Sequence, residues 1–356
     1  ENVTSATYCT TTDNICEPNI SANISNNSYT IELEDSEEEQ VVCTRLNGTS
    51  KVICSEPLIA RKTAAETILA GKNLATRTDF SVTVTEDTTG TIYQAEDDDG
   101  TTYYFAGAPT DNWVRFGGFY WRIIRINGDG TIRLIYNGTS TTTTGTQIST
   151  SRFNSSNSNN AHVGFKFTMN NVHGTENNST VLTALNSWYS SNLSSYASDI
   201  DTNAGFCNDR TPYSGTGLGA TATNYVTYNR LVNNKIPSFK CTNNSDLFTV
   251  SSASKGNKAL EYPIGLITAD EVAYAGGVNG LTNQSYYLYN NQNYWTMSPY
   301  WYYRGYAWVF NVNSDGTLIG ISNVTNEYGV RPVINLKADT LFTGTGTSTD
   351  PYVVVG

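Results

Sequence analysis

The C-terminal segment, residues 294–336, constrains the fold of this chain more than any other part of its sequence. Residues 307–313 alternate in the manner of a strand with one buried face, and residues 318–322 form a return strand after the turn sequence Ser-Asp-Gly-Thr. A second turn, residues 323–328, leads to residues 329–336, whose apolar side chains we expect to be buried. The segment therefore predicts a set of antiparallel strands.

Aromatic residues are concentrated just before the first of these strands. Five of the seven residues 300–306 are tyrosine or tryptophan, and soluble proteins seldom expose contiguous apolar surface of that size without a binding use. The alternative is a plain β-meander that uses tyrosine as a strand former. Trp295 and Trp308 are expected to stabilise the fold. We predict an exposed ligand-binding surface formed by Tyr300, Trp301, Tyr302, Tyr303, Arg304, Tyr306, Asn323 and Asn326.

The order of short motifs in this segment resembles a known family. Tyr-Trp-Thr-Met-Ser (294–298) precedes Ala-Trp (307–308), an Asp-Gly turn (315–316) and Val-Arg-Pro-Val (330–333). This order is similar to that of the C-type-lectin-like fold of the formylglycine-generating-enzyme type, found in surface proteins of Firmicutes and in variable proteins of diversity-generating retroelements. The resemblance implies an α+β, β-rich chain with a C-type-lectin-like domain. It also implies that the aromatic run and the turn after the return strand are sites of sequence diversification.

The enzyme activity of that family is not expected here. Formylglycine-generating enzymes use active cysteines, whereas Cys207 and Cys241 lie outside the corresponding C-terminal core and look structural. The two histidines, His162 and His173, lie in polar sequence typical of surface loops, without a nucleophile motif beside them. No cysteine or histidine cluster has the spacing of a zinc site. We therefore expect no catalytic residues, no metal site and no cofactor.

The composition favours an extracellular protein. Only 15% of the 356 residues are charged, against about 25% in typical soluble domains, and Thr, Ser and Asn replace them. The net charge of −11 argues against binding to nucleic acid and to anionic membrane surfaces, because both need a basic surface. We also expect no direct membrane insertion by the given chain. The sequence contains no signal peptide or membrane-spanning run, so we interpret the chain as a mature or truncated ectodomain.

The six cysteines are expected to form disulfides, which implies export from a reducing cytosol. Six cysteines allow 15 connectivities, so local pairing is a preference. The middle pair is the best supported, because its strands flank a hairpin signal, Asn-Gly-Thr-Ser at residues 47–50. The preferred pairs are Cys9 with Cys16, Cys43 with Cys54, and Cys207 with Cys241.

Four regions are expected along the chain. Residues 1–58 form a small cysteine-containing β region, and residues 59–111 form a connector with a helix and a β-hairpin. Residues 112–338 form the C-type-lectin-like domain, with an insertion at residues 137–262. Residues 339–356 are a Gly/Thr spacer and a terminal strand, which could pair with this domain or with the next subunit of a fibre.

Several elements are predicted within these regions. The connector carries a helix over residues 61–76 and a strand pair joined by the acidic turn 96–100, while the main domain begins with a long hairpin ending at residue 136. Residues 137–160 are predicted to be a mobile loop. A helix over residues 177–191 is expected to be capped by Ser179 or Thr180. A buried strand over residues 263–268 is expected to run into a helix capped by Thr268.

The sequence therefore favours a secreted or cell-surface binding protein of a Gram-positive bacterium, with adhesin-like recognition of a glycan or a protein. Tyrosine, tryptophan and arginine suit that function because they supply stiff contact area with a polar tip. A pilin-like or fibre subunit that assembles through its terminal strands is the alternative. A glycan-processing enzyme with unrecognised carboxylates is the third interpretation.

Overall fold

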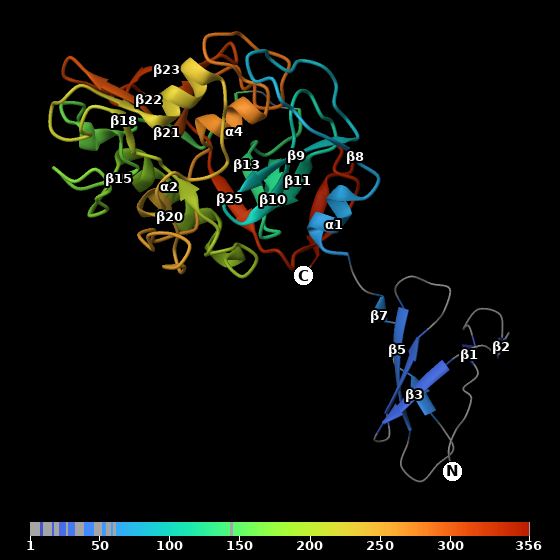
Figure 1. The fold of residues 1–356 in the computed structure, drawn as a ribbon. Coiled ribbons are helices and arrows are strands. Elements are labelled where there is room, and N and C mark those ends of the chain that lie inside the picture. The colour runs from blue at the N-terminus through green and yellow to red at the C-terminus, as the bar shows by residue number, and fades with distance from the viewer. Residues whose placement is uncertain are drawn as a thin grey trace. The chain divides into compact units, whose positions relative to one another are not determined.

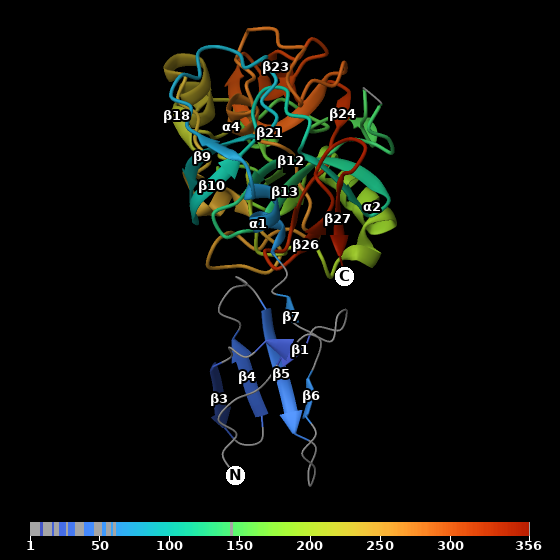
Figure 2. The same ribbon diagram turned by 90° about the vertical axis from the view of Figure 1, so that its right-hand side faces the viewer.

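A computed structural model describes residues 62–142 and 145–355, together with the backbone of seven strands in the N-terminal region. The chain divides into two compact units, residues 1–62 and residues 63–356. Both units are rich in strands, and the larger one also contains several short helices (Figures 1 and 2). Each unit is described by itself below.

The N-terminal unit is built from antiparallel strands. A two-stranded ladder places Cys9 opposite Cys16, and a five-stranded sheet places Cys43 opposite Cys54. The side chains of these four cysteines lie outside the described part of the chain, so their two disulfides stay predictions. The strands are β1 (Tyr8–Cys9), β2 (Cys16–Glu17), β3 (Ser21–Ser25), β4 (Ser28–Glu32), β5 (Glu39–Arg45), β6 (Val52–Cys54) and β7 (Leu58–Ile59).

The first large sheet of the main unit has nine strands in the order β26-β27-β11-β12-β10-β9-β8, with β13 and then β25 on the other side of β12. Strands β12 and β13 form its centre, and nearly all their side chains are buried. The strands are β8 (Asn73–Ala75), β9 (Thr91–Asp97), β10 (Gly100–Tyr104), β11 (Trp113–Phe116), β12 (Phe119–Ile126), β13 (Ile132–Tyr136), β25 (Val333–Leu336), β26 (Leu341–Thr343) and β27 (Tyr352–Val355).

The second large sheet has seven strands in the order β14-β24-β21-β19-β18, with β22 and β23 added beside β21. Its strands come from the C-terminal segment and from three short pieces of the predicted insertion. They are β14 (Ser149–Ser151), β18 (Pro212–Ser214), β19 (Thr223–Tyr225), β21 (Tyr294–Tyr303), β22 (Tyr306–Val312), β23 (Leu318–Asn323) and β24 (Tyr328–Val330). Two small ladders join β15 (Lys166–Phe167) to β16 (Asn177–Asn178), and β17 (Phe206–Cys207) to β20 (Leu247–Phe248).

Helices are short in this unit, and the described ones include none long and apolar enough to cross a membrane. Helix α2 packs on the nine-stranded sheet, where the Trp188 ring lies 5.3 Å from Phe119 and 5.6 Å from Tyr136. The helices are α1 (Ala64–Leu69), α2 (Thr180–Asn192), α3 (Val226–Tyr228) and α4 (Ala269–Tyr274), with the 3-10 turns η1 (Asn160–Val163), η2 (Ser194–Tyr196) and η4 (Asn244–Asp246) and the π-helical turn η3 (Asn229–Asn234).

Helix caps match the local sequence signals. The Ser179 hydroxyl accepts a hydrogen bond from the Leu182 N–H and so caps α2, as predicted. Thr268 caps α4 in a capping box with Glu271, whose side chain accepts a bond from the Thr268 N–H at 2.9 Å. Such caps satisfy backbone N–H groups that the first helical turn leaves without partners.

Three expectations about elements are wrong. The helix expected over residues 61–76 spans only Ala64–Leu69, because Gly71 turns the chain with a φ of 72°. Residues 263–268 form no strand and make a single bridge, from Gly265 to Val333. In the segment 137–160, expected to be a loop, β14 pairs with β24. Low complexity did not prevent this pairing, because a backbone ladder needs no particular side chains.

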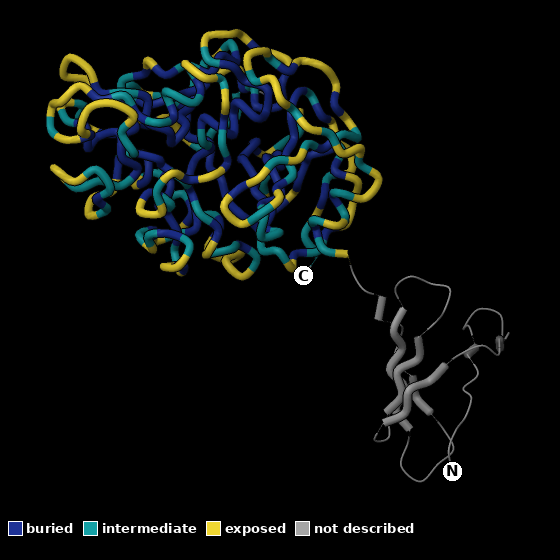
Figure 3. The backbone as a smooth tube through the Cα atoms, viewed as in Figure 1, coloured by how far each residue is buried: buried dark blue, intermediate teal, exposed yellow. Residues whose placement is uncertain are grey.

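The expected connector and tail belong to the main unit. Strands β8, β9 and β10 from residues 59–111 and strands β26 and β27 from residues 339–356 all lie in the nine-stranded sheet. Terminal strand β27 pairs with β11 and β26 of its own chain. Buried residues run through the middle of this unit and exposed ones gather at its turns (Figure 3).

Candidate functional site

The turn between β21 and β22 determines how their aromatic residues are presented. Arg304 and Gly305 form a two-residue connection, with Tyr303 opposite Tyr306, and both turn residues have positive φ values of 52° and 87°. Two positive φ values in such a turn indicate type I′, whose twist matches that of the strands it joins. An arginine at a position that favours asparagine or glycine costs about 1 kcal/mol.

The run of aromatic residues is a strand, and its side chains alternate between two faces. Tyr300 is 7% exposed and Tyr302 is 1% exposed, so the expectation that both lie on the surface is wrong. The Tyr302 hydroxyl donates to the Ser158 carbonyl oxygen at 2.8 Å. The Tyr300 ring covers Gly320, where an added Cβ would lie 1.7 Å from the ring. Successive residues of a strand point to opposite faces, which the interpretation as a loop neglected.

The other face of the same strands carries what we call the aromatic surface, formed by Trp301, Tyr303, Tyr306 and Trp308. Trp301 lies opposite Trp308 with ring centres 5.2 Å apart, and the Trp301 and Tyr303 ring centres are 5.9 Å apart. Tyr303 and Tyr306 are 43% and 47% exposed, and the two tryptophans are half-buried. Tyr228 stacks on Trp301 from the side, with the ring planes 24° apart. The predicted aromatic cluster is therefore only partly exposed.

A row of four side chains crosses the sheet at this point. Ladder pairing places Asn224 of β19 opposite Trp301, Trp301 opposite Trp308, and Trp308 opposite Asn323 of β23. Directly opposite residues of antiparallel strands point to the same face. The two indoles are therefore flanked by carboxamides, of which the sequence analysis named Asn323 and missed Asn224. Neither indole N–H has a hydrogen-bond partner within the described residues.

The remaining predicted residues lie in the two turns that follow β21 and β23 or at the end of β23. Arg304 is exposed, and its guanidinium carbon lies 5.1 Å from the centre of the Tyr303 ring. The side-chain oxygen of Asn323 accepts hydrogen bonds from the Asn157 side-chain amide and from the Thr325 hydroxyl, so this side chain also shapes the following turn. Asn326 lies in that turn and donates to the Tyr328 hydroxyl at 3.2 Å.

A second site, which we call the polar cavity, lies in the same unit and was missed by the sequence analysis. It has a volume of about 60 Å³. Exposed residues at its mouth include Asp98, Asp99 and Lys240, whereas most of the other charged side chains are buried. The ionisable groups that line it are Asp97, Asp98, Asp99, Arg125, Asp129, Arg133, Asp209, Arg230, Lys240, Asp270 and Glu271.

Ion pairs link one side of the cavity to the nine-stranded sheet. Arg125 contacts Glu271 at 3.2 Å and Asp97 at 2.6 Å, and Arg133 contacts Glu271 at 2.5 Å. Burial opposes ionisation of Glu271, but Arg133 and Arg125 outweigh it and lower the pKa of this carboxyl. The network holds α4 against β12 and β13.

Another part of the lining contains a carboxylate with one oxygen that has no partner in the described part of the chain. Arg230 joins Asp209 and Asp270, with a nitrogen to oxygen distance of 2.8 Å to each. Asp209 is 3% exposed, and burial raises the pKa of its carboxyl although Arg230 is adjacent. Its backbone is left-handed, with a φ of 45°. Its Oδ1 atom has no hydrogen-bond partner within the described residues.

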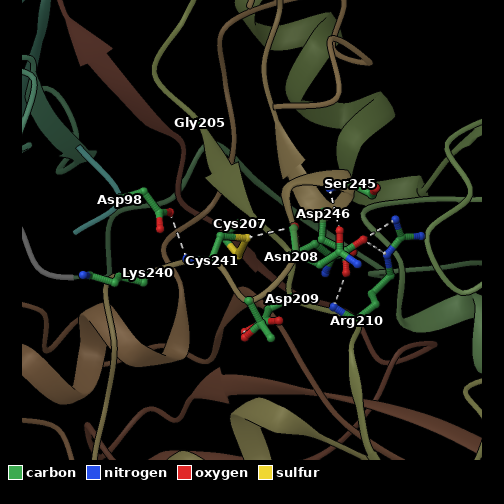
Figure 4. The surroundings of a disulfide bond; sticks show 12 residues. Asp98, Gly205, Cys207, Asn208, Asp209, Arg210, Lys240, Cys241, Ser245 and Asp246 are labelled. Atoms are coloured by element: carbon green, nitrogen blue, oxygen red, sulfur yellow. Dashed lines mark hydrogen bonds and ion pairs between the residues drawn. A yellow bond between two sulfur atoms is a disulfide. The ribbon is translucent and has the colours of Figure 1, made fainter. Parts of the chain in front are cut away.

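A disulfide lies beside Asp209, as Figure 4 shows. Cys207 is bonded to Cys241, as the sequence predicted, and their Cα atoms are 5.7 Å apart. The Cys241 N–H donates to Asp98 at 2.9 Å, which connects the disulfide to the mouth of the cavity. Cys207 itself lines the cavity.

Both histidines pack against other residues of the main unit. His162, expected on the surface, is buried in η1, and burial lowers its pKa. His173 is part-buried, with its Nδ1 atom 3.0 Å from Asp246, which also pairs with Arg210 (Figure 4). Within the residues that the structure describes, no group of three or more histidine, cysteine, aspartate or glutamate side chains is arranged to hold a metal ion.

Comparison with known proteins covers the C-terminal part alone. Residues 272–338 match the model of a domain of unknown function, DUF6273. The matched segment includes strands β21 to β25, and therefore the aromatic surface. No curated protein and no solved structure matches the chain.

Proposed function

We propose that the chain is a non-enzymatic binding protein, secreted or displayed on the surface of a Gram-positive bacterium, whose C-type-lectin-like domain binds a carbohydrate at the aromatic surface. The observation that carries this proposal is the row Asn224, Trp301, Trp308 and Asn323, which crosses four adjacent strands. Two neighbouring indoles offer flat apolar faces, and the carboxamides beside them offer hydrogen bonds. Binding sites commonly combine apolar contact area with a few polar groups that fix the orientation of the ligand.

The chemistry of this surface supports binding over catalysis. The four aromatic residues offer indole rings, phenol rings and their polar atoms, and Arg304 adds a positive charge that stacks on Tyr303. Such groups bind ligands through contact area and hydrogen bonds. The indole N–H groups of Trp301 and Trp308 have no hydrogen-bond partner within the described residues, which is unusual because buried donors normally have one.

Two further observations concern the location of the protein and the alternative of a fibre. The Cys207–Cys241 disulfide supports export, because such bonds persist mainly outside a reducing cytosol. The alternative of a fibre that assembles through terminal strands gains no support from β27, which pairs with β11 and β26 of its own chain. We therefore favour carbohydrate binding over fibre assembly.

A glycan array tests the proposal. The purified chain is applied to the array beside the double variant Tyr303→Ala, Tyr306→Ala, which removes two exposed rings without opening the core. We expect the parent chain to bind a defined set of glycans and the double variant to lose about tenfold or more in signal. Tyr196→Ala is the matched control, since Tyr196 is an exposed tyrosine of η2. No glycan binding, or equal binding by the double variant, contradicts the proposal.

A further inference from the structure

The polar cavity has an excess of negative charge. Seven carboxylates and four basic groups line it, and Lys255, which pairs with Asp99 and Asp129, brings the basic groups to five. The three arginines already have carboxylate partners, at 2.5 to 3.2 Å. Lys240 is exposed and has no carboxylate partner within the described residues, but seven carboxylates against five basic groups still leave an excess of negative charge.

Two buried oxygen atoms of this cavity have no hydrogen-bond partner in the described part of the chain, whereas the Arg133 Nε atom, which forms no regular hydrogen bond, lies 2.5 Å from Glu271 in an ion pair. Asp209 Oδ1 and Asn127 Oδ1 both belong to residues that line the cavity, are buried, and accept no hydrogen bond within the described residues. A buried acceptor without a donor is costly, and a buried carboxylate oxygen most of all. These two buried acceptors indicate a missing donor.

The size of the cavity limits the ligand. A water molecule needs about 10–15 Å³ of such space, so about 60 Å³ accommodates a group of a few heavy atoms. The exposed residues Asp98, Asp99 and Lys240 place the opening at the surface. A donor that reaches Asp209 must therefore be small, or be the end of a flexible side chain.

We propose that the polar cavity binds a small organic cation with an ammonium group, whose N–H groups donate to Asp209 Oδ1 and Asn127 Oδ1. An ammonium supplies both the positive charge and the several donors that the cavity lacks. A free alkylamine and the side chain of a lysine in a peptide share this chemistry. The proposal does not depend on the aromatic surface.

The first test compares two cations of equal charge. Ethylammonium chloride has N–H donors and tetramethylammonium chloride has none, so only ethylammonium should bind the purified chain in a calorimetric titration and raise its melting temperature. Nα-acetyl-lysine N-methylamide distinguishes the sources: tighter binding than ethylammonium indicates a peptide lysine, and weaker binding indicates a free amine. An equal response to both ammonium salts, no response, or a larger response to calcium chloride overturns the proposal.

Two variants test the site. Asp209→Asn keeps the shape of the side chain and removes its charge, and we expect it to weaken ethylammonium binding about tenfold or more. Asp98→Asn, at the exposed mouth, removes a charge but keeps an oxygen that can accept the Cys241 N–H, and it should weaken binding about threefold. Asp339→Asn, an exposed carboxylate outside the cavity, is the matched control and should bind like the parent chain. Parental affinity in both cavity variants overturns the proposal.

Discussion

The two ends of β21 contain the same kinds of residue in opposite environments. Near its start, Trp295 is fully buried, and its indole N–H donates to the Ser151 carbonyl oxygen at 2.8 Å. Near its end, Trp301 is half-buried, and its indole N–H has no partner within the described residues. Aromatic content alone therefore does not separate buried from exposed positions of this strand. The two tryptophans differ in ring exposure and in whether the indole N–H has a partner in the protein.

The largest effect is expected at the buried end. Trp295→Ala removes a ring whose centre lies 4.6 Å from that of Tyr328 and 5.9 Å from that of Phe153. It also removes the indole N–H that donates to the Ser151 carbonyl oxygen. We expect a loss of about 3–5 kcal/mol in the free energy of unfolding, measured by denaturant titration. A loss below about 1 kcal/mol would show that this end of the strand is not core.

Glu271→Gln tests whether the charged network beside the cavity stabilises the fold. Because Arg133 and Arg125 lower the pKa of Glu271 against the effect of burial, its contribution is fully present above the ordinary glutamate pKa of about 4.3 and is lost as the pH falls through the lower pKa of the folded state. The variant should lose about 3 kcal/mol at pH 7, with a smaller difference at acid pH. Unfolding curves at pH 7 and at pH 3 measure this, and a pH-independent difference contradicts it.

Adjacent tyrosines of β21 sharpen the comparison further. Tyr302→Ala should cost about 3 kcal/mol, since it removes a buried ring and the bond to Ser158. Tyr303→Ala should cost about 0.5 kcal/mol, because its ring is exposed. Thermal unfolding of the two variants side by side gives the measurement. Similar losses for both would remove the distinction between the two faces of the strand.

Local signals in the sequence predicted local structure well. The cap residues Ser179 and Thr268, the acidic turn between β9 and β10, and the disulfide from Cys207 to Cys241 all occur as predicted. Each depends on residues close in sequence or on a simple pairing preference. The C-type-lectin-like assignment depends on the long-range arrangement of the strands and stays a prediction.

Which residues of the aromatic run are buried could not be predicted from local sequence signals. Which of Tyr300 to Tyr303 face inward depends on Gly320, Phe310 and Ser158, which pack against them from other parts of the chain. Strict strand alternation would have separated Tyr300 and Tyr302 from Trp301 and Tyr303. The same partial exposure limits any sequence diversification of residues 300–306 to the outward-facing positions.

The polar cavity could not be predicted because its lining comes from five distant segments of the chain, residues 97–99, 125–133, 204–209, 230–247 and 268–271, with Ser298 as a further lining residue. One signal was present in the sequence. Arg125 and Arg133 lie among isoleucine and leucine residues of strands that are buried on both faces. Charged residues at such positions need partners, and their partners mark a polar site.

The smallest effect on stability is expected at the turn. Arg304→Asn replaces a residue strained by its positive φ with one that favours this turn, so stability should stay unchanged or rise by about 0.5 kcal/mol. Affinity for the glycan found on the array should fall, because the charge beside Tyr303 is lost. Calorimetry of unfolding and of glycan binding separates the two effects. A loss of stability without a loss of affinity would make Arg304 a structural residue only.

Fluorine NMR of the chain labelled with 5-fluorotryptophan tests the central claim most directly. The six tryptophans give separate signals, each assigned by a Trp→Phe variant, and the glycan found on the array is added in steps. We predict that the signals of Trp301 and Trp308 shift together, while those of the buried Trp121 and Trp295 stay in place. Shifts confined to other tryptophans, with Trp301 and Trp308 unchanged at saturation, would contradict the assignment of the aromatic surface as the binding site.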